Sequence, residues 1–194
     1  MRIIAGKARR LPLRTLPGRD TRPTTDRIKE TLFNILSPRL DGAYFLDLFA
    51  GSGQIGLEAI SRGCAYCVFV DNSKKACDVI AENMRFTKLD GQCELVRADA
   101  LSALVRLEGK YRFDLIFLDP PYRAGVEADV LRTLAGSELM KKDALIVVEA
   151  DVHTDFSYVQ AFGLTVVREK IYKTNKHVFL KRGYYEESNL SGQL

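Results

Sequence analysis

The sequence predicts an α/β fold with a doubly wound, mostly parallel seven-stranded sheet, and three observations lead to this prediction. From Ala43 onward, short apolar runs that suit buried strands alternate with segments of helical periodicity. A glycine-rich turn, Gly51-Ser52-Gly53, follows the first of these runs. The last two strand patterns flank Lys173-Thr174-Asn175, as in an antiparallel hairpin at the edge of a sheet.

The predicted elements follow one another in a regular order. Each strand pattern is rich in β-branched and other apolar residues, and each helix pattern repeats its apolar residues every three or four positions. The predicted strands are 44–48, 66–70, 93–98, 113–118, 144–149, 164–172 and 176–181, and the predicted helices are 27–36, 54–62, 73–87, 101–107 and 126–134.

The first 40 residues differ in charge from the rest of the chain. They hold ten Lys or Arg against three Asp or Glu, whereas the remaining 154 residues hold 19 against 22. We interpret residues 1–40 as a basic extension (a small hairpin plus a helix) packed on a core domain, 41–183, with a tail at 184–194. Such an arm suits a polyanionic partner, although a solvated basic tail has the same composition. The predicted nucleic-acid-binding residues of the arm are Lys7, Arg9, Arg10, Arg14, Arg19 and Arg22.

Length and composition argue against several classes of protein. No apolar run approaches the roughly 18–20 residues that span a bilayer. The first residues also lack the apolar stretch of a signal peptide, so we expect a cytoplasmic protein. Cys64 and Cys67 have a zinc-type spacing, but no second pair or nearby histidine completes a site. We therefore expect reduced thiols and no metal.

The turn after the first strand predicts a cofactor site. Glycines let the backbone approach a ligand closely, and the helix that follows points its N-terminal amides at it. The ends of the first three strands carry the acids Asp47, Asp71 and Asp99, which suit an ammonium group, two ribose hydroxyls and an adenine amine. The cofactor-binding residues predicted from this part of the chain are Asp47, Phe49, Ala50, Gly51, Ser52, Gly53, Asp71, Asn72, Asp99 and Ala100.

Two cofactors compete for this turn. Gly51-x-Gly53-x-x-Gly56 matches the dinucleotide fingerprint, and Asp71 also suits NAD. S-adenosylmethionine uses the same turn but needs an acid for its ammonium group, where Asp47 stands. An NAD enzyme would need a further substrate domain, for which little chain remains. Each acid alone could be a turn cap or a solvated loop residue. All three together favour S-adenosylmethionine.

The fourth strand pattern ends in Asp119-Pro120-Pro121-Tyr122, which we predict to be the catalytic loop. A carboxylate and a carbonyl at Asp119 and Pro120 can accept hydrogen bonds from an exocyclic NH2 group. Successive prolines fix φ and remove amide donors, and a tyrosine ring offers a surface on which a base can stack. A plain strand-ending turn uses the same residues. Together with the cofactor site, the loop predicts methylation of a planar amine.

Asp-x-Phe-x-Gly-x-Gly at 47–53 and Asp-Pro-Pro-Tyr at 119–122 resemble the class I S-adenosylmethionine-dependent amino-methyltransferases of nucleic acids, which have a Rossmann-like fold. More narrowly, segments 1–7, 22–30 and 56–63 resemble the RsmD family, bacterial enzymes that methylate the N2 amine of a guanine in small-subunit (16S) ribosomal RNA. The resemblance extends to about residue 150 and thins beyond it. Tyr172-Lys173-Thr174 lacks the family's glycine, and Asp71 stands where the family often has Glu.

The resemblance implies a function and further site residues. Residues 22–25 would contact the cofactor and the target nucleotide, which adds Thr24 to the cofactor site. The implied partner is ribosomal RNA, within the small subunit or its assembly intermediate, and we expect a monomer. Three alternatives stay open: an adenine-N6 DNA methyltransferase, a nonenzymatic RNA-binding or ribosome assembly factor, and an NAD-linked oxidoreductase.

Overall fold

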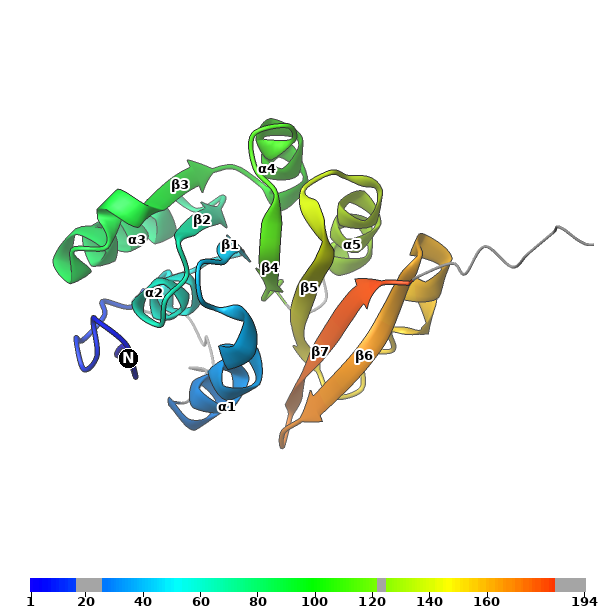
Figure 1. Ribbon diagram of the computed structural model, residues 1–194, viewed down its shortest axis with the longest axis horizontal. Helices are drawn as coiled ribbons and strands as arrows, with labels where there is room; N and C mark the ends of the chain where they lie inside the picture. The colour runs from blue at the N-terminus through cyan, green and yellow to red at the C-terminus, as the bar shows by residue number, and fades with distance from the viewer. Residues whose placement is uncertain (17–25, 122–124, 184–194) are drawn as a thin grey trace, which may run out of the picture.

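The computed structural model describes residues 1–16, 26–121 and 125–183. Seven strands form one sheet in the order β3-β2-β1-β4-β5-β7-β6 (Figure 1). The strands from β3 to β5 pair in parallel, whereas β7 is antiparallel to both β5 and β6. The predicted doubly wound sheet with an antiparallel hairpin at its edge is therefore confirmed. The strands are β1 (Tyr44–Leu48), β2 (Tyr66–Asp71), β3 (Cys93–Arg97), β4 (Phe113–Leu118), β5 (Met140–Asp151), β6 (Leu164–Ile171) and β7 (Asn175–Arg182).

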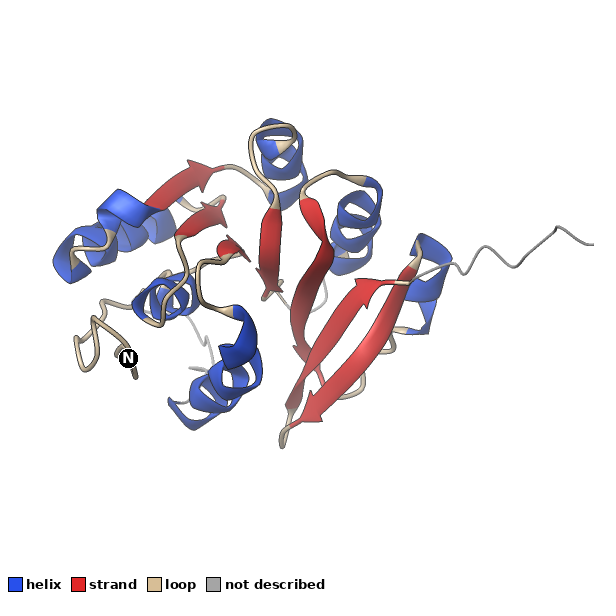
Figure 2. Cartoon of the chain, in the orientation of Figure 1, coloured by secondary structure: helices blue, strands red, loops and turns tan. Residues whose placement is uncertain are grey.

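Helices cover both faces of the sheet (Figure 2). One apolar core joins α1, α2 and α3 to one face, through residues such as Phe33, Ile60 and Ile80. The second core joins α4 and α5 to the other face, through residues such as Leu104 and Leu131. The helices are α1 (Asp26–Leu36), α2 (Gln54–Ser61), α3 (Lys74–Thr87), α4 (Ala100–Leu107) and α5 (Val126–Gly136), with short 3₁₀ turns η1 (Ser37–Arg39), η2 (Asp90–Gln92) and η3 (Ser157–Phe162).

Two features of the C-terminal half were not predicted. β5 begins at Met140, four residues before its predicted start, because Met140 pairs with Phe113 before the register shifts at Phe113/Leu115. Residues 141–143 are all charged, so the apolar pattern that predicts a strand begins only after them. The six-residue 3₁₀ turn η3 also escaped prediction, and 3₁₀ runs of this length are uncommon.

The start of the basic extension packs on α2 and α3. Within residues 1–16, Arg2 and Pro12 form an antiparallel bridge, and Ile3 N–H and Leu13 N–H donate across it to the carbonyl oxygens of Leu11 (3.0 Å) and Met1 (3.0 Å), as in a short hairpin. The buried carboxylate of Glu58 accepts hydrogen bonds from the backbone N–H groups of Ile4 (2.7 Å) and Ala5 (3.0 Å). It also contacts the buried ammonium group of Lys29 at 3.4 Å. A buried acid of α2 therefore fixes the extension and α1 together.

A second connection runs through α3. The side-chain amide of Asn83, which is buried, donates to the carbonyl oxygens of Arg14 (3.0 Å) and Ser52 (2.9 Å). Its oxygen accepts from the Arg14 N–H at 2.9 Å. One side chain therefore joins the extension to the glycine turn.

Among the described residues, no helix is long and apolar enough to cross a membrane. The four cysteines are free thiols. Within the same ranges, no three His, Cys, Asp or Glu side chains gather as a metal site would require.

Candidate functional site

Four acids lie on one face of the sheet near the carboxyl ends of its strands. Asp47 pairs in register with Phe69 of β2 and Phe117 of β4. Asp71 and Asp119 each follow one of these phenylalanines by two positions, and Glu149 of β5 likewise follows Val147, the partner of Phe117. Because side chains alternate along a strand, all four acids point to the face that α1, α2 and α3 cover.

The glycine turn stands at the centre of this edge. Gly53 adopts a left-handed conformation (φ 75°) and caps α2. The carboxylate of Asp71 accepts hydrogen bonds from Gly51 N–H (2.9 Å) and Ser73 N–H (2.8 Å), so it fixes both the turn and the start of α3. A side chain at Gly56 would meet the ring of Phe69 at 2.3 Å, and its absence lets α2 pack closely on β2. The turn is thus held rigidly at the sheet edge.

Asp47 is a buried acid that accepts one hydrogen bond in the described structure. Its Oδ2 accepts from Gly56 N–H at 3.0 Å, and no described lysine or arginine pairs with it. Burial, and then the negative charge of Asp71, raise the pKa of Asp47 to about 7, against the opposing effect of the Gly56 hydrogen bond. A cation bound at this edge would find a carboxylate that lacks a positive partner.

Asp119 directly follows β4, beside the end of β1. Its N–H donates to the carbonyl oxygen of Leu48 (3.5 Å), and its residue is exposed to solvent. Although part of the residue is exposed, protein atoms crowd its carboxyl group, so desolvation raises the pKa of Asp119 well above its usual value, and the charges of Glu149 and Asp47 raise it further. Pro120 is buried and Pro121 is exposed. The structure therefore places Asp119 at the carboxyl end of β4, beside the end of β1 from which the glycine turn follows.

The remaining predicted cofactor residues lie around the same edge. Phe49 takes a left-handed backbone conformation (φ 63°), which is uncommon for an aromatic residue and indicates local strain. Asp99 is exposed and caps α4 by accepting from Ser102 N–H at 2.9 Å, a bond that holds the pKa of Asp99 below its usual value. Ala50 and Ala100 are buried, whereas Asn72 is exposed.

The predicted nucleic-acid-binding residues Lys7, Arg9, Arg10 and Arg14 are all exposed. Lys7 bonds Gln92, and Arg14 pairs with Glu82. Arg9 and Arg10 lie at the turn of the extension, where Arg10 has a positive φ of 72°. Four predicted site residues, Arg19, Arg22, Thr24 and Tyr122, lie outside the described residues.

Sequence reasoning did not find Glu149 or the residues around it. Glu149 is buried next to Asn175 and His177, which come from β7, 26 and 28 positions further along the chain. Its position at the end of a fifth apolar strand, like the acids of the earlier strands, was the one available signal. His177 lies inside a strand and carried no motif.

Comparisons with known proteins identify relatives over most of the chain. The family described as Conserved hypothetical protein 95 matches residues 1–181. Ribosomal RNA small subunit methyltransferase D of Escherichia coli (strain K12) is 36% identical over 173 residues, which cover 88% of this chain and 84% of that protein. The solved structure of yhhF from Escherichia coli has a TM-score of 0.83 and 33% identity, covering 94% of this chain and 98% of that chain.

A more distant structure shares the fold. SMU.776, solved in complex with SAH, has a TM-score of 0.65 and 16% identity, covering 79% of this chain and 49% of that one. The family match and the close relatives together establish the relationship. The chain belongs to the Conserved hypothetical protein 95 family, the RsmD family, to which the Escherichia coli ribosomal RNA small subunit methyltransferase D also belongs.

Proposed function

We propose that this chain transfers a methyl group from S-adenosylmethionine to the exocyclic N2 amine of a guanine in small-subunit ribosomal RNA. The observation that carries the proposal is the position of Asp119 beside the glycine turn, since β4 and β1 are paired neighbours whose ends coincide at Leu48 and Leu118. Membership in the RsmD family and the names of the relatives supply the ribosomal substrate.

The residues at the sheet edge fit the proposed methyl donor. Asp47 is a buried carboxylate without a described cationic partner, which suits the ammonium group of the donor. Each Asp71 oxygen accepts one backbone N–H and keeps acceptor capacity for a ribose hydroxyl. The left-handed Gly51 and Gly53 leave the turn without a Cβ at the point of approach.

The residues of this chain contribute to catalysis by positioning the target amine and by accepting hydrogen bonds from it. When bound, S-adenosylmethionine supplies a methyl group that is already activated by its sulfonium charge. The carboxylate of Asp119 and the carbonyl of Pro120 accept hydrogen bonds from the NH2 group and orient its lone pair toward that methyl group. We assign base stacking to Tyr122 on the residue type alone. The target base must be unpaired or flipped to reach this edge.

The extension supplies the proposed RNA contacts. Lys7, Arg9, Arg10 and Arg14 are exposed cations on one short segment, together with Arg19 and Arg22 from the sequence. Their phosphate contacts would make binding depend on salt concentration. We propose that the small subunit, or an assembly intermediate of it, provides further docking surface for a monomeric enzyme.

Replacing Asp47 with asparagine is expected to change the stability of the folded chain in a pH-dependent way. The folded chain holds the Asp47 proton more tightly than the unfolded chain, so the folded state loses stability as the pH rises from 3.8 to about 7. We expect Asp47→Asn to be more stable than the wild type at pH 8, by on the order of 2–4 kcal/mol without ligand. Thermal unfolding at pH 5 and pH 8 tests this.

The same variant tests the donor site. We expect S-adenosylmethionine to raise the melting temperature of the wild type and to have little effect on Asp47→Asn, because the ammonium group loses its counter-charge. Equal ligand-induced shifts in both proteins would show that Asp47 does not hold the donor. A control is Asp129→Asn, which alters an exposed acid on α5.

Labelled methyl transfer tests the proposed reaction. The acceptors are small ribosomal subunits from cells lacking the enzyme, free ribosomal RNA and duplex DNA, each digested to nucleosides after reaction. We expect label in N2-methylguanosine from subunits or RNA. Label confined to N6-methyladenine from DNA would replace this proposal with the adenine-N6 alternative, and label in neither, with S-adenosylmethionine bound, would overturn both.

A further inference from the structure

A cluster of buried polar side chains lies on β5 and β7 beside the candidate catalytic loop. Glu149, Asn175 and His177 are each less than one-tenth exposed. Glu149 and His177 are register partners on the two antiparallel strands, and Asn175 lies two positions before His177 on the same face. The proposed reaction, as derived above, does not use them.

Both carboxylate oxygens of Glu149 have a partner in the cluster. Its Oε1 accepts a hydrogen bond from the Asn175 side-chain amide at 2.7 Å, and its Oε2 lies 3.3 Å from His177 Nε2. The other ring nitrogen, Nδ1, lies 3.3 Å from the hydroxyl oxygen of Tyr172. Burial, and then the charge of Glu149, raise the pKa of Tyr172 to about 12, so this hydroxyl keeps its proton and can donate to Nδ1. Nε2–H of His177 then donates to Glu149.

Aromatic rings fix the imidazole in this position. The ring of Tyr172 meets His177 edge-on with centroids 5.2 Å apart, and Phe117 of β4 does the same at 6.1 Å. Phe117 belongs to the strand that carries Asp119 two positions later. The cluster is therefore packed directly against the strand that ends in the catalytic loop.

Asp119 and Glu149 each follow one residue of the last register pair of β4 and β5. β4 and β5 pair in parallel with Leu118 opposite Val148, so the next residues, Asp119 and Glu149, stand side by side and project to the same face. Neighbouring strands are about 4.8 Å apart, which puts two carboxylates close together. Glu149 raises the pKa of Asp119 more than Asp47 does.

We propose that Glu149, held by His177 and Asn175, is a positioning residue that makes Asp119 a proton acceptor for the methylated amine. This inference rests on the proposed function. As the amine nitrogen forms its bond to the methyl carbon, the carbon–sulfur bond breaks and both of its electrons go to sulfur. The nitrogen then carries a positive charge and one proton too many. That proton passes to the Asp119 carboxylate and from there to water, which restores the enzyme.

Other charged groups around Asp119 and Glu149 are few among the described residues. Asp47 faces Asp119 from β1, and Asp71 of β2 acts on Asp47. His177 faces Glu149 from β7, and Arg168 of β6 acts on Tyr172. Lys176 bonds Glu169 and lies over the ring of Phe156, which belongs to the other core of the sheet. Among the described charges, removal of Glu149 is therefore expected to lower the pKa of Asp119 most.

The test is the pH dependence of single-turnover methyl transfer in Glu149→Gln. Glutamine keeps the shape and an acceptor for Asn175 but removes the charge. We expect the acidic limb of the wild-type profile to move to lower pH by about one unit, because Asp119 then ionises more easily. A merely structural role of Glu149 would lower the rate without moving the midpoint.

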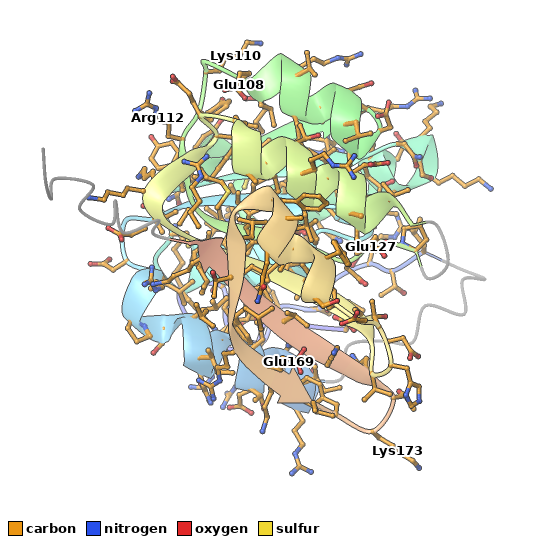
Figure 3. The ribbon with its side chains drawn as sticks, turned by 90° about the vertical axis from the view of Figure 1, so that its right-hand side faces the viewer. Glu108, Lys110, Arg112, Glu127, Glu169 and Lys173 are labelled. Carbon is orange, nitrogen blue, oxygen red and sulfur yellow. The ribbon has the colours of Figure 1, made fainter. Side chains whose placement is uncertain are left out.

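The matched control is Glu169→Gln, which removes the same charge from the outer strand β6 (Figure 3). Its midpoint is expected to stay at the wild-type value. An unchanged or higher midpoint in an active Glu149→Gln would overturn the inference and leave the proposed function intact. Absence of methyl transfer by the wild type to any acceptor would count against the proposed function instead.

A second measurement applies even where Glu149→Gln does not fold or the wild type shows no transfer. The ¹³C-carboxyl resonance of Asp119 is followed by NMR in the wild-type protein and identified as the signal missing from Asp119→Asn. A titration midpoint well above the ordinary range of a carboxyl group supports the inference. A midpoint within or below that range overturns it.

Discussion

Asp119→Ala is expected to reduce methyl transfer by about a thousandfold or more, since the variant loses both a hydrogen-bond acceptor and a proton acceptor for the amine. Affinity for S-adenosylmethionine should stay near that of the wild type. The glycine turn and its partner Asp71 belong to β1, β2 and their loops, and their hydrogen bonds do not involve Asp119. Single-turnover transfer and calorimetric titration of the donor measure the two quantities separately.

The matched control for this variant is Asp129→Ala, which removes an acid from the exposed surface of α5. Its turnover should equal that of the wild type. Wild-type turnover in Asp119→Ala would remove Asp119 from the mechanism. Loss of donor binding in that variant, at unchanged stability, would reassign Asp119 to the donor site.

Glu58→Ala is expected to lower the free energy of unfolding by about 3–5 kcal/mol, because it leaves the ammonium group of Lys29 buried without its counter-charge. Burial already lowers the pKa of Lys29, and the charge of Glu58 opposes that shift. The backbone N–H groups of Ile4 and Ala5 also lose their acceptor. Urea denaturation at pH 7 measures the change.

Two further variants separate the buried charge from a general loss of packing. Glu82→Ala removes the exposed partner of Arg14 and should cost about 0–1 kcal/mol, as surface ion pairs usually do. Adding Lys29→Met to Glu58→Ala should recover part of the loss, because the fully buried ammonium group is then gone and only Arg62 still lacks its partner. A Glu58→Ala protein that unfolds at the wild-type urea concentration would contradict the role given to this ion pair.

The sheet and the acids at its edge could be predicted because their signals are local. Consecutive apolar residues indicate a buried strand, and an acid directly after such a strand lies at the carboxyl edge of a parallel sheet. Asp47, Asp71 and Asp119 were placed correctly in this way. The end of β4 and the end of β1 meet because the two strands are paired, which the fold class already implied.

Residues whose role depends on distant pairing could not be predicted. Glu58 looks like an ordinary acid in the middle of α2, and its burial follows from the packing of residues about 54 positions earlier. His177 lies opposite Glu149 because of the register of β7 on β5, and no pattern within either strand specifies that register. The antiparallel pairing of the extension stays short, at the Arg2–Pro12 bridge, because other N–H groups of the extension bond α2 and α3.

The docking of the extension on α2 and α3 has a consequence for synthesis of the chain. Its residues leave the ribosome well before their partners: Glu58 lies 54 positions after Ile4, and Asn83 lies 69 positions after Arg14. Contacts between such distant residues form only after the intervening chain has been made. The cationic arm of a nascent chain therefore becomes ordered only once α3 has emerged. The positive charges of the arm can therefore take a fixed arrangement only after the donor-binding half of the chain has folded.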